Sequence, residues 1–256
     1  MVRAAPPKHA PREDDSKEQL PLSELPARPS GKRPKRSGKQ TQIPRRDEDS
    51  ETINTQTRLR LNSEDPVERA AVLSELALTG GHDSFGLINK AFDDPSPEVR
   101  NAAARALYEL RSDRTSSFIK AFRDASAERR CRIAGAVTDS GLAGDALVNL
   151  SSEDPDTAYD AFSLLFLIAK AGEVEALLQA VEEHPSIEIR QTLVQLLAQS
   201  GQTKVLPAFG RLAVRQSLPS EVRSALMEAI HQIRSEQLKT PPAAALLPGT
   251  SKNESE

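Results

Sequence analysis

The sequence predicts an all-α fold, a right-handed solenoid of about six helical hairpins stacked side by side. A short arginine motif recurs every 30 to 33 residues, and aliphatic residues follow it at helical spacing. Pro, Asp and Gly mark the expected helix ends. Because one hairpin cannot bury both of its apolar faces, its neighbours in the array must cover them.

The recurring motif is an arginine column near the start of each long helix, interrupted once by an aspartate. Its members are Arg69, Arg100, Arg130, Asp160, Arg190 and Arg223. Seven residues after each member stands an aliphatic residue: Leu76, Leu107, Val137, Leu167, Leu197 and Ile230. Spacings of three, four and seven describe one face of an α-helix. The column therefore predicts six long helices in a regular array.

Acidic residues, prolines and glycines mark where the helices begin and end. An acid precedes most long helices, where it meets free N–H groups and the positive end of the helix dipole. These acids are Asp65, Asp94, Asp124, Asp154 and Glu183. Shorter helices are expected over residues 84–93, 115–124, 142–151, 173–183 and 203–216. A further helix over residues 51–61 would cover the first hairpin through Ile53, Leu59 and Leu61.

Residues 94–111 carry a family resemblance. They read Asp-Pro-Ser-Pro-Glu-Val-Arg-Asn-Ala-Ala-Ala-Arg-Ala-Leu-Tyr-Glu-Leu-Arg and resemble the consensus of the HEAT repeat family, in the short form of phycobilisome-lyase-like repeats. The resemblance extends over about residues 62–236. It implies acid and arginine columns that pair along the array as a ladder, which Asp160 would break at the fourth unit. It implies no particular activity, because such repeats serve unrelated roles.

The two ends of the chain differ in composition from its middle. Eight of the 18 prolines lie in the first 44 residues and three in the last 16. Segments with so few apolar residues do not offset the entropy of ordering. We therefore expect a disordered arm over residues 1–58, the solenoid over 59–238 and a disordered tail over 239–256.

The cysteine count and the apolar runs indicate the compartment. A single cysteine excludes an intramolecular disulfide and is typical of a reducing compartment. The most apolar run, residues 161–169, is far shorter than the roughly 20 residues that span a bilayer. We expect a cytoplasmic protein without membrane insertion.

The arm is basic and the remainder of the chain is acidic. Residues 28–46 hold eight basic side chains and no acid, whereas residues 61–236 hold 18 Lys or Arg against 26 Asp or Glu. The candidate contact residues of the arm are Lys32, Arg33, Lys35, Arg36, Lys39, Arg45 and Arg46. They suit nucleic acid or another anionic surface, although no aromatic residue within 1–84 is available to stack on bases. The alternative is a solvated tail.

The sequence contains no constellation typical of an enzyme. The four histidines form no HExxH motif and no pair at i, i+4, and no phosphate loop or nucleophile elbow is present. Cys131 lies among arginines, which lower the pKa of a thiol, but it has no base beside it and occupies a position filled elsewhere by small or polar residues. We expect no catalysis, no cofactor and no metal.

Partner-binding residues are expected on the outward face of the long helices, one, five and eight positions after the column. The candidates are Asn101, Arg105, Tyr108, Leu165, Ile168, Gln191 and Gln195. Leu165 and Ile168 belong to a helix that is apolar nearly all round. Such a helix is either fully covered by its neighbours or forms an exposed binding patch.

Three functions follow as hypotheses. The first is a non-catalytic scaffold or adaptor that binds protein partners, of unknown identity, through the solenoid surface. The second is an accessory protein for attachment of bilin, a tetrapyrrole, implied only by the resemblance to lyase-type repeats. The third is binding of nucleic acid or an anionic surface through the basic arm.

Overall fold

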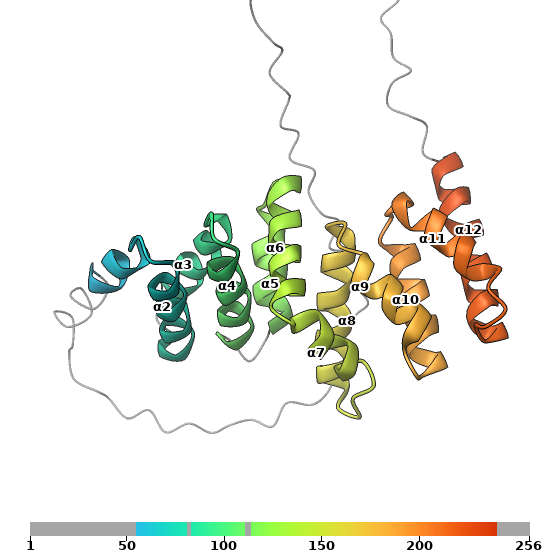
Figure 1. The fold of residues 1–256 in the computed structure, drawn as a ribbon, viewed down its shortest axis with the longest axis horizontal. Coiled ribbons are helices and arrows are strands. Elements are labelled where there is room, and N and C mark those ends of the chain that lie inside the picture. The colour runs from blue at the N-terminus through green and yellow to red at the C-terminus, as the bar shows by residue number, and fades with distance from the viewer. Residues whose placement is uncertain (1–54, 81–82, 111–113, 240–256) are drawn as a thin grey trace, which may run out of the picture.

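The computed structural model describes residues 55–80, 83–110 and 114–239, and these residues form helices and turns without a strand. Figure 1 shows the helices standing in sequence along one extended array. The predicted all-α solenoid is confirmed, and the described residues make six helical hairpins. Most of the arm and nearly all of the predicted tail, residues 1–54 and 240–256, lie outside the described residues.

Long and short helices alternate along the chain. The long helices are α2 (Pro66–Thr79), α4 (Pro97–Glu109), α6 (Ala127–Asp139), α8 (Pro155–Lys170), α10 (Ile187–Gln199) and α12 (Ser220–Lys239). The short ones are α3 (Ser84–Lys90) with the 3-10 turn η2 (Ala91–Asp93), α5 (Arg114–Arg123), α7 (Leu142–Asn149), α9 (Glu175–Glu183), the 3-10 turn η3 (Thr203–Val205) and α11 (Leu206–Ala213). Residues 55–61 are also helical and precede α2.

Side chains before the long helices accept hydrogen bonds from the backbone N–H groups of the first turn or of the turn leading into it. The Asp65 carboxylate accepts from the N–H of Val67 at 2.9 Å. The Asp94 carboxylate accepts from the N–H of Ser96 at 2.9 Å. His184, which replaces the usual acid, accepts through Nδ1 from the N–H of Ser186 at 3.2 Å. Asp65 and Asp154 are therefore true caps of α2 and α8, Ser126 and Ser186 cap α6 and α10, and Asp94 and His184 instead hold the turn before the helix.

Four arginines of the column tie their long helices to the segment that precedes each of them. Arg69 donates to the carbonyl of Ser63 at 2.8 Å, and Arg100 donates to the carbonyl of Asp94 at 2.9 Å. Arg130 and Arg190 make the equivalent bonds to the carbonyls of Ala125 and Glu182. Buried loop carbonyls need donors, which explains why an arginine recurs at this position.

One rung of the ladder implied by the family resemblance is present. The Arg69 guanidinium donates from Nη2 and Nε to the two oxygens of Asp94, at 2.8 and 2.9 Å. Both side chains are largely buried, with 11% and 14% of their surface exposed. Asp160, which breaks the column, instead accepts a hydrogen bond from the Thr115 hydroxyl at 2.7 Å.

In the first three hairpins the long helices lie side by side and run in the same direction. The Arg69–Asp94 pair joins the start of α2 to the start of α4. Arg129, at the start of α6, contacts Asp93, which directly precedes the loop before α4, at 3.0 Å. The short helices α3 and α5 pack against α4.

The long helix α8, which follows α7, runs in the opposite direction. The Cys131 thiol at the start of α6 donates to the carbonyl of Ala171 at the end of α8, at 2.9 Å, so these two helices are antiparallel. The Thr115–Asp160 bond instead joins the starts of α5 and α8. Because α8 packs beside α5, it continues the row of short helices rather than the row of long ones.

The change of row occurs at α7. Gly141, with φ +87°, forms the turn between α6 and α7. Figure 1 shows α7 continuing below α6, and α7 packs against both α6 and α8. From there α7, α9 and α11 pack on α8, α10 and α12 respectively. The long and short helices have therefore exchanged layers, although the repeat length in the sequence is unchanged.

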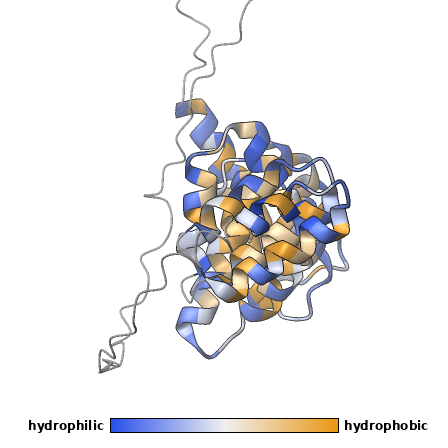
Figure 2. Ribbon diagram, turned by 90° about the vertical axis from the view of Figure 1, so that its left-hand side faces the viewer, coloured by the Kyte–Doolittle hydropathy of each residue, from blue (hydrophilic) through white to orange (hydrophobic). Residues whose placement is uncertain are grey.

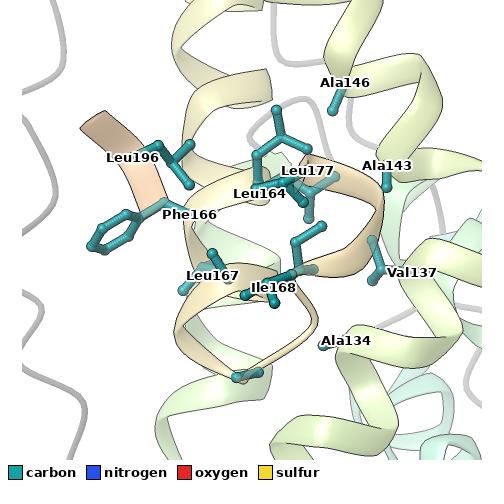
Figure 3. Packing of buried hydrophobic residues seen from close by; sticks show 14 of the residues in the cluster. Ala134, Val137, Ala143, Ala146, Leu164, Phe166, Leu167, Ile168, Leu177 and Leu196 are labelled. Carbon is teal, nitrogen blue, oxygen red and sulfur yellow. The ribbon is translucent and has the colours of Figure 1, made fainter. Parts of the chain in front are cut away.

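The exchange places α8 at the centre of the core. It packs against α5, α6, α7 and α10, and eight of its residues from Ala161 to Ala169 are buried, all except Phe162. Figure 3 shows side chains of α6, α7, α9 and α10 gathered around it. Viewed from the α2 end, apolar residues concentrate between the helices and polar residues lie outside (Figure 2). Leu165 and Ile168 are each 0% exposed, so the expectation that they face outward is wrong.

Helical residues 55–61 lie against the open side of the first hairpin. Arg60 makes a bidentate pair with Glu75 of α2, at 2.7 and 3.1 Å. Leu61 packs against the core, as expected for a covering helix. Leu59 is 69% exposed and therefore does not cover the core. The third expected contact, Ile53, lies outside the described residues.

Candidate interaction surface

Within residues 55–80, 83–110 and 114–239, no three His, Cys, Asp or Glu side chains gather as a metal site would require. Cys131 is exposed, and its thiol donates to a backbone carbonyl. His184 accepts a hydrogen bond from the N–H of Ser186 in the turn before α10, and His231 is exposed on α12. None of the helices described is long and apolar enough to cross a bilayer.

Three of the predicted contact residues lie together on α4. Arg105 is exposed and donates to the carbonyl of Ser140, at the α6–α7 turn. Tyr108 is half-buried and its hydroxyl accepts from Arg114 at 3.0 Å, while the Arg114 guanidinium lies 4.2 Å from the ring centroid. Asn101 is half-buried on the same helix. These polar side chains brace α4 against the next hairpin while leaving one face open to solvent.

The two remaining candidates with solvent-accessible side chains lie on the other layer of helices from α4. Gln191 is half-buried and Gln195 is exposed, both on α10. Because α10 belongs to the row that α8 begins, this helix occupies the layer of α5 rather than that of α4. The candidates on α4 and those on α10 therefore lie on different layers of the array. The seven candidate residues of the basic arm, Lys32 to Arg46, lie outside the described residues.

The most exposed apolar face in the first half of the array lies on α2. Val67 is 69% exposed and Leu78 is 83% exposed, and Ala71 and Ser74 between them are also exposed. Their spacings of four, three and four residues place them on one stripe of the helix. We call these four residues the α2 stripe.

The neighbouring helix shows that this stripe is unusual. One repeat later, the positions of Val67, Ser74 and Leu78 are taken by Glu98, Arg105 and Glu109. All three are exposed and charged. The expectation of positions one, five and eight after the column missed the stripe, because its apolar members lie two before, two after and nine after it. The spacing of Val67, Ala71 and Leu78 was the available signal.

Arg60 forms ion pairs with two carboxylates beside the α2 stripe. Its pair with Glu75 lowers the pKa of that carboxyl through a side-chain hydrogen bond. Arg60 also lies 3.6 Å from Glu68. One guanidinium therefore offsets only part of the charge of two carboxylates along the margin of the stripe, which leaves this margin net negative.

Two open grooves cross the described surface. The first, of about 540 Å³, lies where helical residues 55–61 meet α3, η2 and the start of α4. It contains the Arg69–Asp94 pair and apolar side chains such as Leu61 and Leu87. Burial alone would raise the pKa of Asp94, but hydrogen bonds from Arg69 and from the N–H of Ser96 outweigh it and lower that pKa.

The second groove, of about 590 Å³, lies between α9 and α11. Its α9 wall carries Glu175, Glu182 and Glu183, and its α11 side carries Arg211 and Arg215. Arg215 pairs with Glu182 across the groove. The opposed charges therefore satisfy each other in part.

The chain resembles known repeat proteins over part of its length. Residues 56–137 match the family model of HEAT repeats, which confirms the resemblance for that part of the chain. No curated protein sequence matches the chain significantly. Similar solved structures include an engineered protein with 18% identity and a TM-score of 0.28, covering 70% of this chain and 96% of that one. Another is the designed armadillo repeat protein YIII(Dq)4CqI, with 18% identity and a TM-score of 0.27, covering 70% of this chain and 98% of that one.

Proposed function

We propose that this HEAT-repeat solenoid is a non-catalytic scaffold that binds a protein partner through the face formed by α2 and α4. The α2 stripe is the single observation that carries the proposal. Val67 and Leu78 are exposed on a helix whose inward side already supplies Val72 and Leu73 to the core. Isolated apolar residues are common on protein surfaces, but an apolar stripe three turns long is typical of an interaction site.

The surroundings of the stripe have the composition of an interface. Interfaces combine a desolvated apolar centre with a polar rim. Here the stripe supplies the centre, and Glu98, Asn101 and Arg105 of α4 supply the rim on the adjacent helix. The side chain of Arg105 is already held by the Ser140 carbonyl, so ordering it on binding costs little entropy.

The length of the stripe fits a helical ligand. Val67 and Leu78 are eleven residues apart, which is about 17 Å along the helix axis. An amphipathic helix of about three turns can lay its apolar face along that distance. The partner class supported by this face is therefore a protein segment with apolar side chains at helical spacing.

The test compares two pairs of exposed substitutions. Val67→Ser with Leu78→Ser should abolish capture of the partner, because losing a central apolar anchor costs about 2 kcal/mol, or roughly 30-fold in affinity. Val148→Ser with Val214→Ser is the matched control, since these valines are 72% and 76% exposed on α7 and at the end of α11. Partners captured from native lysate by the unsubstituted chain would be quantified for both variants.

Both variants should retain the helical circular dichroism of the unsubstituted chain, because neither pair lies in the core. Equal capture by the stripe variant and the unsubstituted chain contradicts the proposal. Loss of capture in the control variant instead would locate the binding face on the second half of the array.

A further inference from the structure

We infer that residues 19–26 of the same chain cover the α2 stripe when no partner is bound. These residues read Gln-Leu-Pro-Leu-Ser-Glu-Leu-Pro. The inference rests on the proposed function, because it assigns an occupant to the face through which the partner binds. The scaffold would then be self-inhibited, and a partner would compete with the chain's own segment.

The stripe is apolar and has no cover among the described residues. Val67 and Leu78 keep most of their surface exposed, although helical residues 55–61 already lie against the same helix through the Arg60–Glu75 pair. The corresponding side chains of α4 are charged and are stable in water without a cover. An occupant is therefore needed on α2 in particular.

The chain preceding Thr55 offers one concentrated apolar segment. Large apolar residues are rare in residues 1–54, and three of the seven lie within six positions. The seven are Met1, Val2, Leu20, Leu22, Leu25, Ile43 and Ile53. Pro21 lies between Leu20 and Leu22, and Pro26 follows Leu25. Each proline restricts its own backbone φ angle, which lowers the entropy lost when the segment docks.

The segment is tethered close to the stripe. Thirty positions separate Leu25 from Thr55, where the described chain begins beside α2. A chain of that length spans about 30 Å on average as a random coil and up to about 100 Å when extended. The stripe is about 17 Å long. Both ends of the stripe are therefore within reach, at an effective concentration on the order of a millimolar.

Charge favours the same occupant. Residues 28–46 follow the leucines and carry eight basic side chains and no acid. Exposed carboxylates flank the stripe at Glu64 and Asp65 before α2 and at Glu98 and Glu109 on α4. Arg60 compensates Glu68 and Glu75 only. A basic segment leaving the stripe would meet this excess of exposed acidic side chains.

A second copy of the chain is a weaker candidate. A stable interface buries about 800 Å² on each partner, far more than four side chains of one helix provide. A tethered segment needs no such area, because its effective concentration replaces the free concentration of a partner. The observations therefore favour an intramolecular cover.

The test measures the accessibility of a thiol placed on the stripe. Ser74→Cys, in a full chain that also carries Cys131→Ser, puts one thiol between Ala71 and Leu78 without removing an apolar residue. We expect it to react with a disulfide reagent about three- to tenfold more slowly than the same thiol in a chain with Leu20→Ser, Leu22→Ser and Leu25→Ser, because the rate scales with the uncovered fraction. Equal rates overturn the inference.

Two controls separate the alternatives. Ser224→Cys, on the exposed face of α12, should react equally with and without the three leucine substitutions. Leu246→Ser with Leu247→Ser, in the other tail, should leave the Ser74→Cys rate unchanged. Protection that increases with protein concentration would identify a second copy and overturn the inference.

The partner capture assay distinguishes this inference from the proposed function. If both hold, the three leucine substitutions increase capture by about the factor seen in thiol reactivity. If only the scaffold proposal holds, capture depends on Val67 and Leu78 and is insensitive to the three leucines. If the thiol is protected but Val67→Ser with Leu78→Ser does not change capture, the segment covers a face that the partner does not use.

Discussion

The first three hairpins and the last three are built from the same repeat of about 30 residues, yet they place their long helices in different layers. In the first half, α2, α4 and α6 form one row, and their outward residues share one face. In the second half, α8, α10 and α12 form a row that continues from α5. A repeat length therefore fixes which residues form each helix, but the layer of each helix depends on the turns between them.

The largest loss of stability is expected from a substitution at the junction between the two halves. Leu165→Ala removes a fully buried side chain of α8, the helix that both halves surround, and should destabilise the chain by about 2–5 kcal/mol. Met227→Ala, at a 59% exposed position of α12, is the control and should cost less than about 0.5 kcal/mol. Urea unfolding followed by circular dichroism measures both. A cost below about 1 kcal/mol for Leu165→Ala would contradict the central position of α8.

A second effect concerns the turn at which the layers exchange. Gly141 has φ +87°, a region that costs a side chain about 1–2 kcal/mol, so Gly141→Ala should be destabilising. Gly144→Ala is the matched control three residues later inside α7, where a Cβ meets nothing within 4 Å. It should stabilise the chain by about 0.5–1 kcal/mol, because alanine favours a helix. Effects of the same sign at both positions would argue against a specific turn at Gly141.

A smaller effect tests the contact that replaces the arginine column. Thr115 is buried and donates to Asp160, so Thr115→Val should cost about 1–2 kcal/mol by leaving a carboxylate without this partner. Thr192→Val removes a hydroxyl that donates within its own helix, to the carbonyl of Glu188, and should cost less. Thermal unfolding of the two variants gives the comparison. An equal loss of stability in the two variants would show that the hydrogen bond between α5 and α8 contributes no more than one within a single helix.

The smallest effect is a pH dependence confined to the first half. The pKa of Asp94 is lowered in the folded chain, so this carboxylate contributes stability at pH values above its ordinary pKa of 3.8. That contribution is lost as the pH falls through the lowered value. Asp94→Asn should therefore make stability less dependent on pH below about 4 in urea titrations. Unchanged steepness would mean that the Arg69–Asp94 pair is not formed in solution.

The local structure could be predicted because it depends on neighbours in the sequence. The expected short helices over 84–93 and 115–124 match α3 with η2, and α5, to within one residue at each end. Capping acids and the arginine column act within one hairpin, so their spacing encodes them directly. The substitution of His184 for an acid also preserves the bond to the N–H two residues later that Asp94 makes before α4.

The layer exchange could not be predicted, because it leaves the spacing unchanged. Arg130, Asp160 and Arg190 are each 30 residues apart across the junction. Only two features coincide with it, the loss of the arginine at Asp160 and the apolar character of α8 all round. Both follow from the structure, since Asp160 faces α5 and α8 is enclosed by four helices. Leu165 and Ile168 were expected to face outward for the same reason, because their positions were read from the spacing alone, whereas both are buried.

The exchange itself is tested most directly by disulfide formation with the natural Cys131. It lies at the start of α6, and its thiol contacts the carbonyl of Ala171 at the end of α8. We expect Ala171→Cys to form a disulfide with Cys131 under mild oxidation, and Ala158→Cys, in the first turn of α8, to form none. A cross-link to position 158 and none to position 171 would mean that α8 runs parallel to α6, as in an uninterrupted stack.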